Sequence, residues 1–313
     1  MPQRTRTYQN HHLESTRWDR IVHRPGDIVI STSAKAGTTW MQRIVSLLVF
    51  GPGPLPASLN DLSPWIDMRV PFPIEEVAAN LEGQEHRRFV KTHLPLDAIP
   101  YYDDSRYIVV ARDTRDVFMS IYNHYHSHTD FALEIFNSGD RVGAPLAPCP
   151  DDPRDLWQDW ITRASFDWED DGFPYWSHHY HANSYWQFRH LPNLLFVHYN
   201  DLSADLEVQM RRVSSFLDID VEEKDWPALV EGACFDSMKQ EAMQQEVDGT
   251  APFGMIWKEG AASFFFKGTN DRWRDVLTPE DLELYEIAVG RLDPELRGWL
   301  ENGSLVAGYP QSR

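Results

Sequence analysis

Four short, almost entirely apolar runs mark the strands that the sequence predicts. They cover residues 27–32, 88–93, 106–111 and 194–199. Runs of this length are typical of strands buried on both faces of a sheet. Between them, apolar residues recur at helical spacing over residues 40–50, 74–81, 116–125, 182–190 and 205–217. This alternation predicts an α/β fold with a central, mostly parallel, doubly wound sheet and helices on both faces.

The same alternation continues along the chain without an internal repeat or a linker, so we expect a single domain over residues 1–313. Two stretches interrupt it. Residues 127–181 are rich in Asp, Pro and aromatic side chains, and residues 240–266 form a long connection with weak periodicity. Insertions of this kind often form lids or pocket walls, which is the role we expect for both.

The composition is that of an ordinary soluble protein, with 42% hydrophobic and 25% charged residues. No apolar run approaches the ~20 residues that a membrane-spanning helix needs, and the N-terminus has no apolar stretch of the secretory kind. We therefore expect a cytoplasmic protein, and the presence of only two cysteines agrees with a reducing compartment. The formal net charge of −19 disfavours nucleic acid as a partner.

Residues 33–40, with the sequence Ser-Ala-Lys-Ala-Gly-Thr-Thr-Trp, join the first predicted strand to the first helix. The first N–H groups of a helix lack partners within the helix and lie at the positive end of its dipole, so phosphate binds there readily. Gly37 lets the backbone approach an anion closely, and Lys35 adds a positive charge. Thr38 and Thr39 add hydroxyl donors or cap the helix. We call residues 33–40 the anion loop; a plain helix start with a solvated lysine is its alternative interpretation.

The anion loop is not a Walker A motif, because in that motif the lysine follows the glycine, whereas Lys35 precedes Gly37. Other polar residues lie near the ends of predicted strands. Lys91 and His93 end the second strand, and Arg112 follows the third. Such ends meet at one edge of a parallel sheet, where ligands bind. Taken singly, His93 is more often structural and Arg112 more often pairs with a neighbouring Asp.

Together these segments resemble the cytosolic sulfotransferase family, whose members move a sulfuryl group from 3′-phosphoadenosine 5′-phosphosulfate (PAPS) to a hydroxyl or amine. The anion loop is similar to the family's Pro-Lys-Ser-Gly-Thr-Thr-Trp, and Lys91-Thr-His-Leu-Pro95 is identical to its strand-end signature. Arg112 with Ser120 matches the pair that holds the 3′-phosphate. Further matches are Gly172, Trp176 with His179, Val197-His-Tyr199 and Phe235-Asp-Ser-Met-Lys239. The resemblance extends from about residue 27 to residue 278.

The resemblance implies a mechanism and a set of site residues. His93 would act as general base, Lys35 would stabilise the leaving 3′,5′-diphosphate, and Lys91 would help to hold the sulfuryl group. In such transfers, positioning and cation placement supply most of the catalysis, and no metal is predicted. The implied PAPS contacts are Lys35, Ala36, Gly37, Thr38, Thr39, Trp40, Arg112, Ser120, Tyr199, Phe235, Lys267 and Gly268.

Some positions depart from the family pattern. Phe266 stands where the family has an arginine that contacts the 3′-phosphate, and Ala34 and Ala233 cannot supply side-chain hydrogen bonds. We therefore expect either weaker donor binding or compensation by a neighbour such as Arg272. The family's dimer segment is only partly matched, which leaves a homodimer open; the corresponding residues are Arg274, Thr278, Pro279 and Glu283.

The acceptor is expected to be a small phenol, alcohol, lipid or amine. Aromatic side chains are the candidates for its pocket, although dense aromatic residues more often form core. The candidates are Trp65, Phe72, Tyr122 and Trp176. Histidines at 124, 126 and 128 and at 178, 179 and 181 lack a recognisable metal-site spacing.

Two alternatives accompany the sulfotransferase prediction. A nucleotide-dependent phosphotransferase is disfavoured by the absence of a Walker A motif and by His93 where Mg²⁺ ligands would be needed. A nucleotide-binding module without catalytic activity is favoured only by Ala34 and Phe266, and the presence of Lys35 and His93 argues against it.

Overall fold

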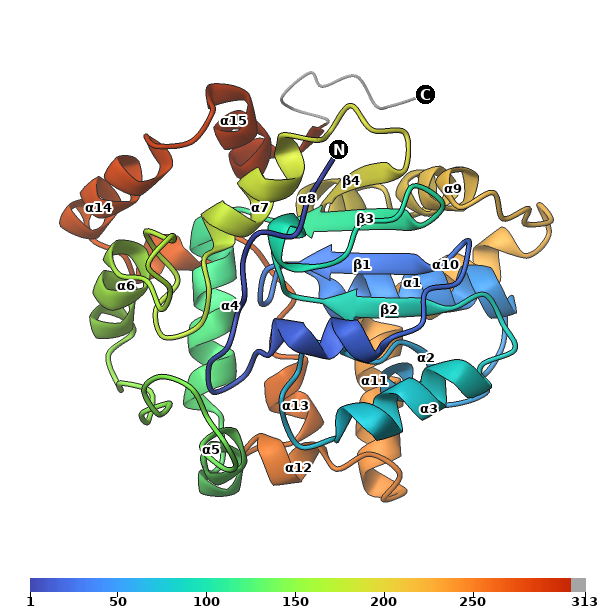
Figure 1. Ribbon diagram of the computed structural model, residues 1–313, viewed down its shortest axis with the longest axis horizontal. Coiled ribbons are helices and arrows are strands. Elements are labelled where there is room, and N and C mark those ends of the chain that lie inside the picture. The colour runs from blue at the N-terminus through green and yellow to red at the C-terminus, as the bar shows by residue number, and fades with distance from the viewer. Residues whose placement is uncertain (305–313) are drawn as a thin grey trace.

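The centre of the computed structural model, which describes residues 1–304, is a sheet of four parallel strands (Figure 1). The strands are β1 (Ile28–Thr32), β2 (Phe89–Thr92), β3 (Arg106–Ala111) and β4 (Leu194–His198). They are ordered β2-β1-β3-β4, and every neighbouring pair is parallel. The strand predictions are confirmed to within one residue at either end.

The strand order reverses at β1, because the chain first adds β2 on one side of it and then crosses to add β3 on the other. In doubly wound sheets, ligands bind outside the carboxyl ends of the strands at such a point. The anion loop follows β1 at this position. A methyl group added at Gly37 would lie only 3.3 Å from Val110 of β3, so the loop lies directly against the neighbouring strand.

Alternation along the strands divides most of the core between the two faces of the sheet. Ile30 and Val110 face one side, which is covered by α1 (Thr38–Phe50), α9 (Leu206–Phe216) and α10 (Trp226–Ala233). Val29 and Val109 face the other, which is covered by α4 (Thr114–His126), α6 (Pro153–Thr162) and α7 (His178–Trp186). Helices on both faces are therefore confirmed, and they hold the sheet edge that carries the predicted site.

The remaining helices surround this centre (Figure 1). They are η1 (Ser15–Arg20), α2 (Leu59–Leu62), α3 (Ile74–Gly83), η2 (Leu96–Ala98), α5 (Asp130–Phe136), α8 (Tyr199–Ala204), α11 (Phe235–Val247), α12 (Phe253–Ile256), α13 (Ala261–Phe264), η3 (Arg272–Asp275), α14 (Pro279–Val289) and α15 (Pro294–Asn302). Across residues 1–304, none of the helices has the length and apolar character needed to cross a membrane.

Residues 240–266 are more regular than their weak periodicity predicts. They comprise most of α11, all of α12 and α13, and short links between them. Only Met238 and Ala242 of α11 are buried, so its apolar side is too narrow to give a clear helical pattern. The main-chain N–H of Ala261 donates to Glu246 (2.9 Å), which ties α13 to α11. Most of this connection is therefore helical, because tertiary contacts stabilise helices that the pattern does not reveal. Its role as a lid or pocket wall stays a prediction.

Candidate active site

Two residues with positive φ shape the anion loop. Lys35 has a φ of 63° and Gly37 a φ of 121°. Gly37 is the N-cap of α1, and no side chain caps the helix there, so the first N–H groups of α1 remain available to an anion. Ala36 is fully buried. The hydroxyl of Thr38 lies 2.5 Å from that of Thr32, which links the first turn of α1 to the end of β1.

The ammonium group of Lys35 lies at the boundary between the anion loop and α4. Its Nζ is 3.4 Å from Nδ1 of His124 and 4.8 Å from the ring centre of Phe264. Burial, followed by the positive charges of Lys91 and Arg112, lowers the pKa of Lys35 to about 8. The positive charges of these three residues repel one another in a buried region. An anion bound between them would therefore stabilise their charged forms.

His93 presents one ring nitrogen to the protein interior. Its Nδ1 lies 2.8 Å from the main-chain carbonyl oxygen of Thr32, which can only accept, so Nδ1 carries the proton. Nε2 is then left as a proton acceptor. Burial, followed by the charge of Lys91, lowers the pKa of His93 to about 3. The imidazole is therefore neutral near pH 7, which is the form a general base requires.

Two tryptophans pack against His93 with different ring orientations. The ring of Trp65 meets it edge-on, with ring centres 4.6 Å apart, and the ring of Trp176 lies more nearly parallel to it at 5.5 Å. Residue 65 also forms an isolated parallel bridge with Lys91, whose Nζ lies 4.9 Å from the centre of the indole ring. Burial lowers the pKa of Lys91 to about 8.

Asp67 is a fully buried residue of this site that sequence reasoning missed. One of its carboxylate oxygens accepts from Nε1 of Trp65 (2.7 Å) and from the main-chain N–H of His93 (3.1 Å). Asp67 therefore positions the predicted base and one predicted wall residue together. The sequence offers one signal for Asp67: it is an acidic residue two positions after Trp65, a predicted pocket residue, with Ile66 between them.

At the end of β3, Arg112 is buried and held by the segment before η3. Its guanidinium donates to Asn270 (3.0 Å) and to the main-chain carbonyl of Thr269 (3.1 Å), and it lies 4.0 Å from the ring centre of Tyr199. On α4, Asp116 accepts from the main-chain N–H of Asp271 (2.7 Å). Residue 120 follows one helical turn later, so Ser120 shares this face of α4 with Asp116.

Arg272 lies near Phe266, the residue that departs from the family pattern. The Arg272 guanidinium is 5.3 Å from the Phe266 ring centre, and the Nζ of Lys267 is also 5.3 Å from it. Nε of Arg272 is buried and has no hydrogen-bond partner. Burial, followed by the positive charge of Arg112, lowers the pKa of Arg272. Arg272 is thus a second arginine beside Arg112 with hydrogen-bonding capacity to spare.

The aromatic residues among the predicted PAPS contacts lie together. The rings of Trp40 and Tyr199 meet edge to face, 5.1 Å apart, and Nε1 of Trp40 donates to the carbonyl of Ala233 (2.8 Å). The Tyr199 hydroxyl donates to the carbonyl of Gly268 (3.2 Å). A methyl group added at Gly268 would come within 2.8 Å of the Phe235 ring, so this glycine allows the two segments to touch.

The four predicted wall residues are not one group. Trp65 and Trp176 flank His93, as described above, whereas Phe72 is 59% exposed. Tyr122 lies on α4 and donates to the carbonyl of Asp151 (2.5 Å). Within residues 1–304, no group of three His, Cys, Asp or Glu side chains is arranged to hold a metal ion.

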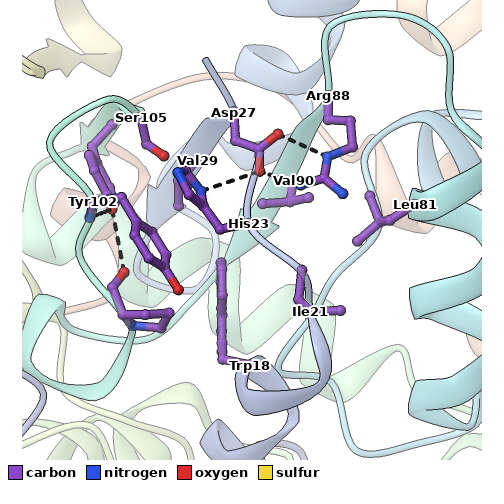
Figure 2. Close-up of a pocket in the computed structure, with 12 residues that line it drawn as sticks. Trp18, Ile21, His23, Asp27, Val29, Leu81, Arg88, Val90, Tyr102 and Ser105 are labelled. Atoms are coloured by element: carbon purple, nitrogen blue, oxygen red, sulfur yellow. Dashed lines mark hydrogen bonds and ion pairs between the residues drawn. The ribbon is translucent and has the colours of Figure 1, made fainter. Parts of the chain in front are cut away.

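A hollow near the amino ends of the strands, opposite the predicted site, lies apart from these residues (Figure 2). Figure 2 shows Asp27 between His23 and Arg88, with both interactions dashed. Asp27 precedes β1 and Arg88 precedes β2, so the hollow lies at the amino ends of the strands. Every predicted catalytic residue lies toward the carboxyl ends.

Comparisons with known proteins agree with this geometry. A model of the sulfotransferase domain family matches residues 25–291. A glycolipid sulfotransferase of Mycobacterium tuberculosis is 32% identical over 95% of this chain and 94% of its own. Cytosolic sulfotransferase 1 of Danio rerio is 31% identical over 88% of this chain and 86% of its own.

Solved structures show the same fold at lower identity. Retinol dehydratase in complex with androsterone and the inactive cofactor PAP aligns with a TM-score of 0.66 and 21% identity, over 89% of this chain and 84% of that one. Mouse sulfotransferase SULT7A1 complexed with PAP gives a TM-score of 0.64 at 18% identity, over 89% and 90%. This likeness confirms the predicted α/β architecture.

The geometry of Asp67 predicts a large loss of stability on its removal. Asp67→Ala would leave the buried main-chain N–H of His93 and the part-buried indole N–H of Trp65 unpaired, each at a cost of about 1–3 kcal/mol. We expect the free energy of unfolding in urea to fall by about 2–5 kcal/mol. Glu85→Ala, at an exposed acidic position, serves as control and should change it by less than about 0.5 kcal/mol. Equal stability of the two variants would contradict the role given to Asp67.

Proposed function

We propose, from the premise that this chain belongs to the sulfotransferase domain family, that it transfers a sulfuryl group from PAPS to a hydroxyl of a small acceptor. The premise makes the chain an enzyme and removes the two alternatives raised by its sequence. Related structures contain PAP, the 3′,5′-diphosphate that remains when PAPS has lost its sulfuryl group. The observation that carries the proposed mechanism is the neutral His93, with Nδ1 fixed on Thr32 and Nε2 left to accept a proton.

The two anionic ends of the donor would bind at different places along the sheet edge. The 5′ end would bind the N–H groups at the start of α1 together with Thr38, Thr39 and Lys35. The 3′-phosphate would bind near Arg112 and Ser120, with Arg272 in the role that Phe266 cannot fill. The adenine would lie among the aromatic residues around Tyr199 and Gly268.

In the proposed reaction, the acceptor oxygen attacks sulfur in line with the bond to the bridging oxygen of PAPS. The new S–O bond forms as the old one breaks, and the acceptor's proton passes to Nε2 of His93. Lys35 stabilises the negative charge that develops on the leaving phosphate oxygen, and Lys91 holds the moving group. The negative charge of bound PAPS offsets that of Lys35 and Lys91, which raises the proton affinity of His93 when catalysis requires it.

Replacing the base separates catalysis from donor binding. His93→Ala should lower kcat by about 10²–10⁴-fold, because the group proposed to take the acceptor's proton is removed. PAP affinity, measured by calorimetry, should change less than about threefold. His190→Ala, at an exposed histidine, is the matched control and should keep full activity. A His93→Ala enzyme with nearly normal turnover would remove His93 from the role of base.

The lysine pKa values predict how PAP binding depends on pH. Lys35 and Lys91, each with a pKa of about 8 in the ligand-free protein, must be protonated to hold the anion. Affinity should therefore be constant from pH 6.5 to 7.5 and fall as pH rises through 8, by up to about tenfold per pH unit for each lysine. Lys35→Arg stays charged and should make the decline shallower. Affinity that is unchanged up to pH 9.5 would contradict this electrostatic account.

Arg272 can be tested through the 3′-phosphate alone. Arg272→Ala should weaken PAP binding by about 10–100-fold, the value of a charge-assisted hydrogen bond, and barely affect binding of adenosine 5′-monophosphate. Arg274→Ala is the matched control, because Arg274 is exposed and paired with Asp271. The assignment fails if both substitutions weaken PAP equally, or if Arg272→Ala weakens both nucleotides equally.

A further inference from the structure

His178, the first residue of α7, lies between the two places where the anionic ends of the donor would bind. Its side chain is 1% exposed. Nδ1 lies 2.6 Å from the hydroxyl of Ser33 in the anion loop, and Nε2 lies 3.1 Å from the main-chain carbonyl oxygen of Arg112. One imidazole ring therefore spans the distance between the 5′ side and the 3′ side of the proposed donor site.

The two partners of this ring fix its tautomer. The carbonyl oxygen of Arg112 can only accept, so Nε2 of His178 carries the proton and donates the hydrogen bond. Nδ1 is then an acceptor, and the hydroxyl of Ser33 donates to it. Burial, followed by the neighbouring His179, lowers the pKa of His178 to about 3, so the ring is neutral near pH 7. A neutral imidazole has one donor and one acceptor, and both are used here.

Both partners lie just beyond the part of the sheet that strand pairing holds. The last residue of β1 that pairs with β3 immediately precedes Ser33, and Arg112 is the first residue after β3. The guanidinium of Arg112 is held by Asn270 (3.0 Å), whereas its main-chain carbonyl is held by His178. His178 therefore continues the connection between the two strand ends after the hydrogen bonds of the sheet have stopped.

The start of α7 is anchored within the protein itself. Ser177 caps the helix with its side chain, and its main-chain N–H donates to Glu169 (3.0 Å). Nδ1 of His179 lies 2.6 Å from a carboxylate oxygen of Asp171. Glu169 and Asp171 are both buried. The residues on either side of His178 are thus held in place, so its ring is a fixed reference for the two segments that it contacts.

A ligand with two anionic ends benefits from binding places that are held at a fixed spacing. Once one end is bound, the other end binds within the same complex, and the gain in affinity depends on how well the spacing of the two places matches the ligand. Binding places that already have this spacing avoid the cost of ordering them when the ligand arrives.

We propose that His178 is a positioning residue that sets the spacing between the 5′-phosphate site in the anion loop and the 3′-phosphate site at Arg112. This inference rests on the sulfotransferase function proposed above and adds a residue that the motif matches do not supply. His178 lies between Trp176 and His179, the two matched positions, and Ser33 precedes the matched part of the anion loop. The contact is therefore formed by positions that these motifs leave open.

Three nucleotides test the spacing on the full-length protein by calorimetry: PAP, adenosine 5′-monophosphate and adenosine 3′-monophosphate. His178→Phe keeps a ring and removes both hydrogen bonds. It should lower PAP affinity by at least about tenfold, because the gain from linked binding of the two ends is reduced. Each monophosphate uses one place only, so its affinity should change less than about threefold.

Three outcomes would overturn the proposal. Unchanged PAP affinity would show that the bridge does not matter for the donor. An equal loss for all three nucleotides would show general damage to the fold. A loss shared by PAP and one monophosphate, with the other unaffected, would assign His178 to a single phosphate site and exclude the spacing role.

Ser33→Ala tests the same bridge from its other end and removes a single hydroxyl. It should reproduce the selective loss of PAP affinity, by about 3–30-fold, and it decides the question if His178→Phe does not fold by circular dichroism. In the double variant, the loss should be no larger than in His178→Phe alone, because both substitutions break one link. Losses that add would give the two residues separate roles and overturn the proposal.

His181→Phe is the matched control on the same helix. Nε2 of His181 lies 2.9 Å from the hydroxyl of Ser31, but Ser31 is also held by strand pairing with Thr92 and Val109. The ratio of PAP affinity to adenosine 5′-monophosphate affinity should therefore stay within about twofold of that of the unaltered protein. A change in this ratio as large as that in His178→Phe would show that any loss of α7 packing has the same effect, and would overturn the specific role of His178.

The outcomes separate this inference from the function on which it rests. If the unaltered protein binds no PAP and forms no sulfated product with any acceptor of a broad panel, the sulfotransferase function itself fails. If the unaltered protein binds PAP and His178→Phe binds it equally well, only the positioning role fails.

Discussion

The hydrogen bond from Nδ1 of His93 to the main-chain carbonyl of Thr32 joins the proposed general base to the end of β1, from which the anion loop begins. The parallel register between β1 and β2 sets Ser31 opposite Thr92, so the residues that follow these positions meet beyond the end of the sheet. The hydroxyl of Thr32 in turn contacts Thr38 at the start of α1. The position of the proposed base relative to the start of the anion loop therefore follows from strand pairing.

Charge placement works against the overall charge of the molecule. The chain carries a formal net charge of −19, yet Lys35, Lys91 and Arg112 converge at one sheet edge. Burial makes the charged form of each of these residues less favourable, as the lowered pKa values of Lys35 and Lys91 show. The same low dielectric strengthens their attraction for an anion that enters among them. Local geometry thus replaces net charge as the source of affinity for the donor.

The parts of the site that the sequence predicts are those in which local pattern and sheet topology suffice. Buried strands are nearly continuous apolar runs, and residues just beyond their carboxyl ends meet at one edge, so Lys35, His93 and Arg112 could be placed together without a structure. Asp67 could not be found in this way, because its function depends on which N–H groups happen to face it. The free Nε of Arg272 likewise depends on packing that no spacing encodes.

Helix α7 contacts β1, the anion loop and the end of β3 through two of its histidines. The hydroxyl of Ser33 lies 2.6 Å from Nδ1 of His178, and the hydroxyl of Ser31 lies 2.9 Å from Nε2 of His181. Since Nε2 of His178 also contacts the carbonyl of Arg112 (3.1 Å), two histidines of one helix hold β1, the anion loop and the end of β3.

The segment before α7 carries the ring that packs on His93. A methyl group added at Gly172 would come within 2.3 Å of the backbone of Trp176, so only glycine permits the tight turn that brings this tryptophan into place. A small shift of α7 would consequently move the anion loop and Trp176 together. The fold thereby keeps the two parts of the proposed site in a fixed relation, which is what the proposed in-line transfer requires.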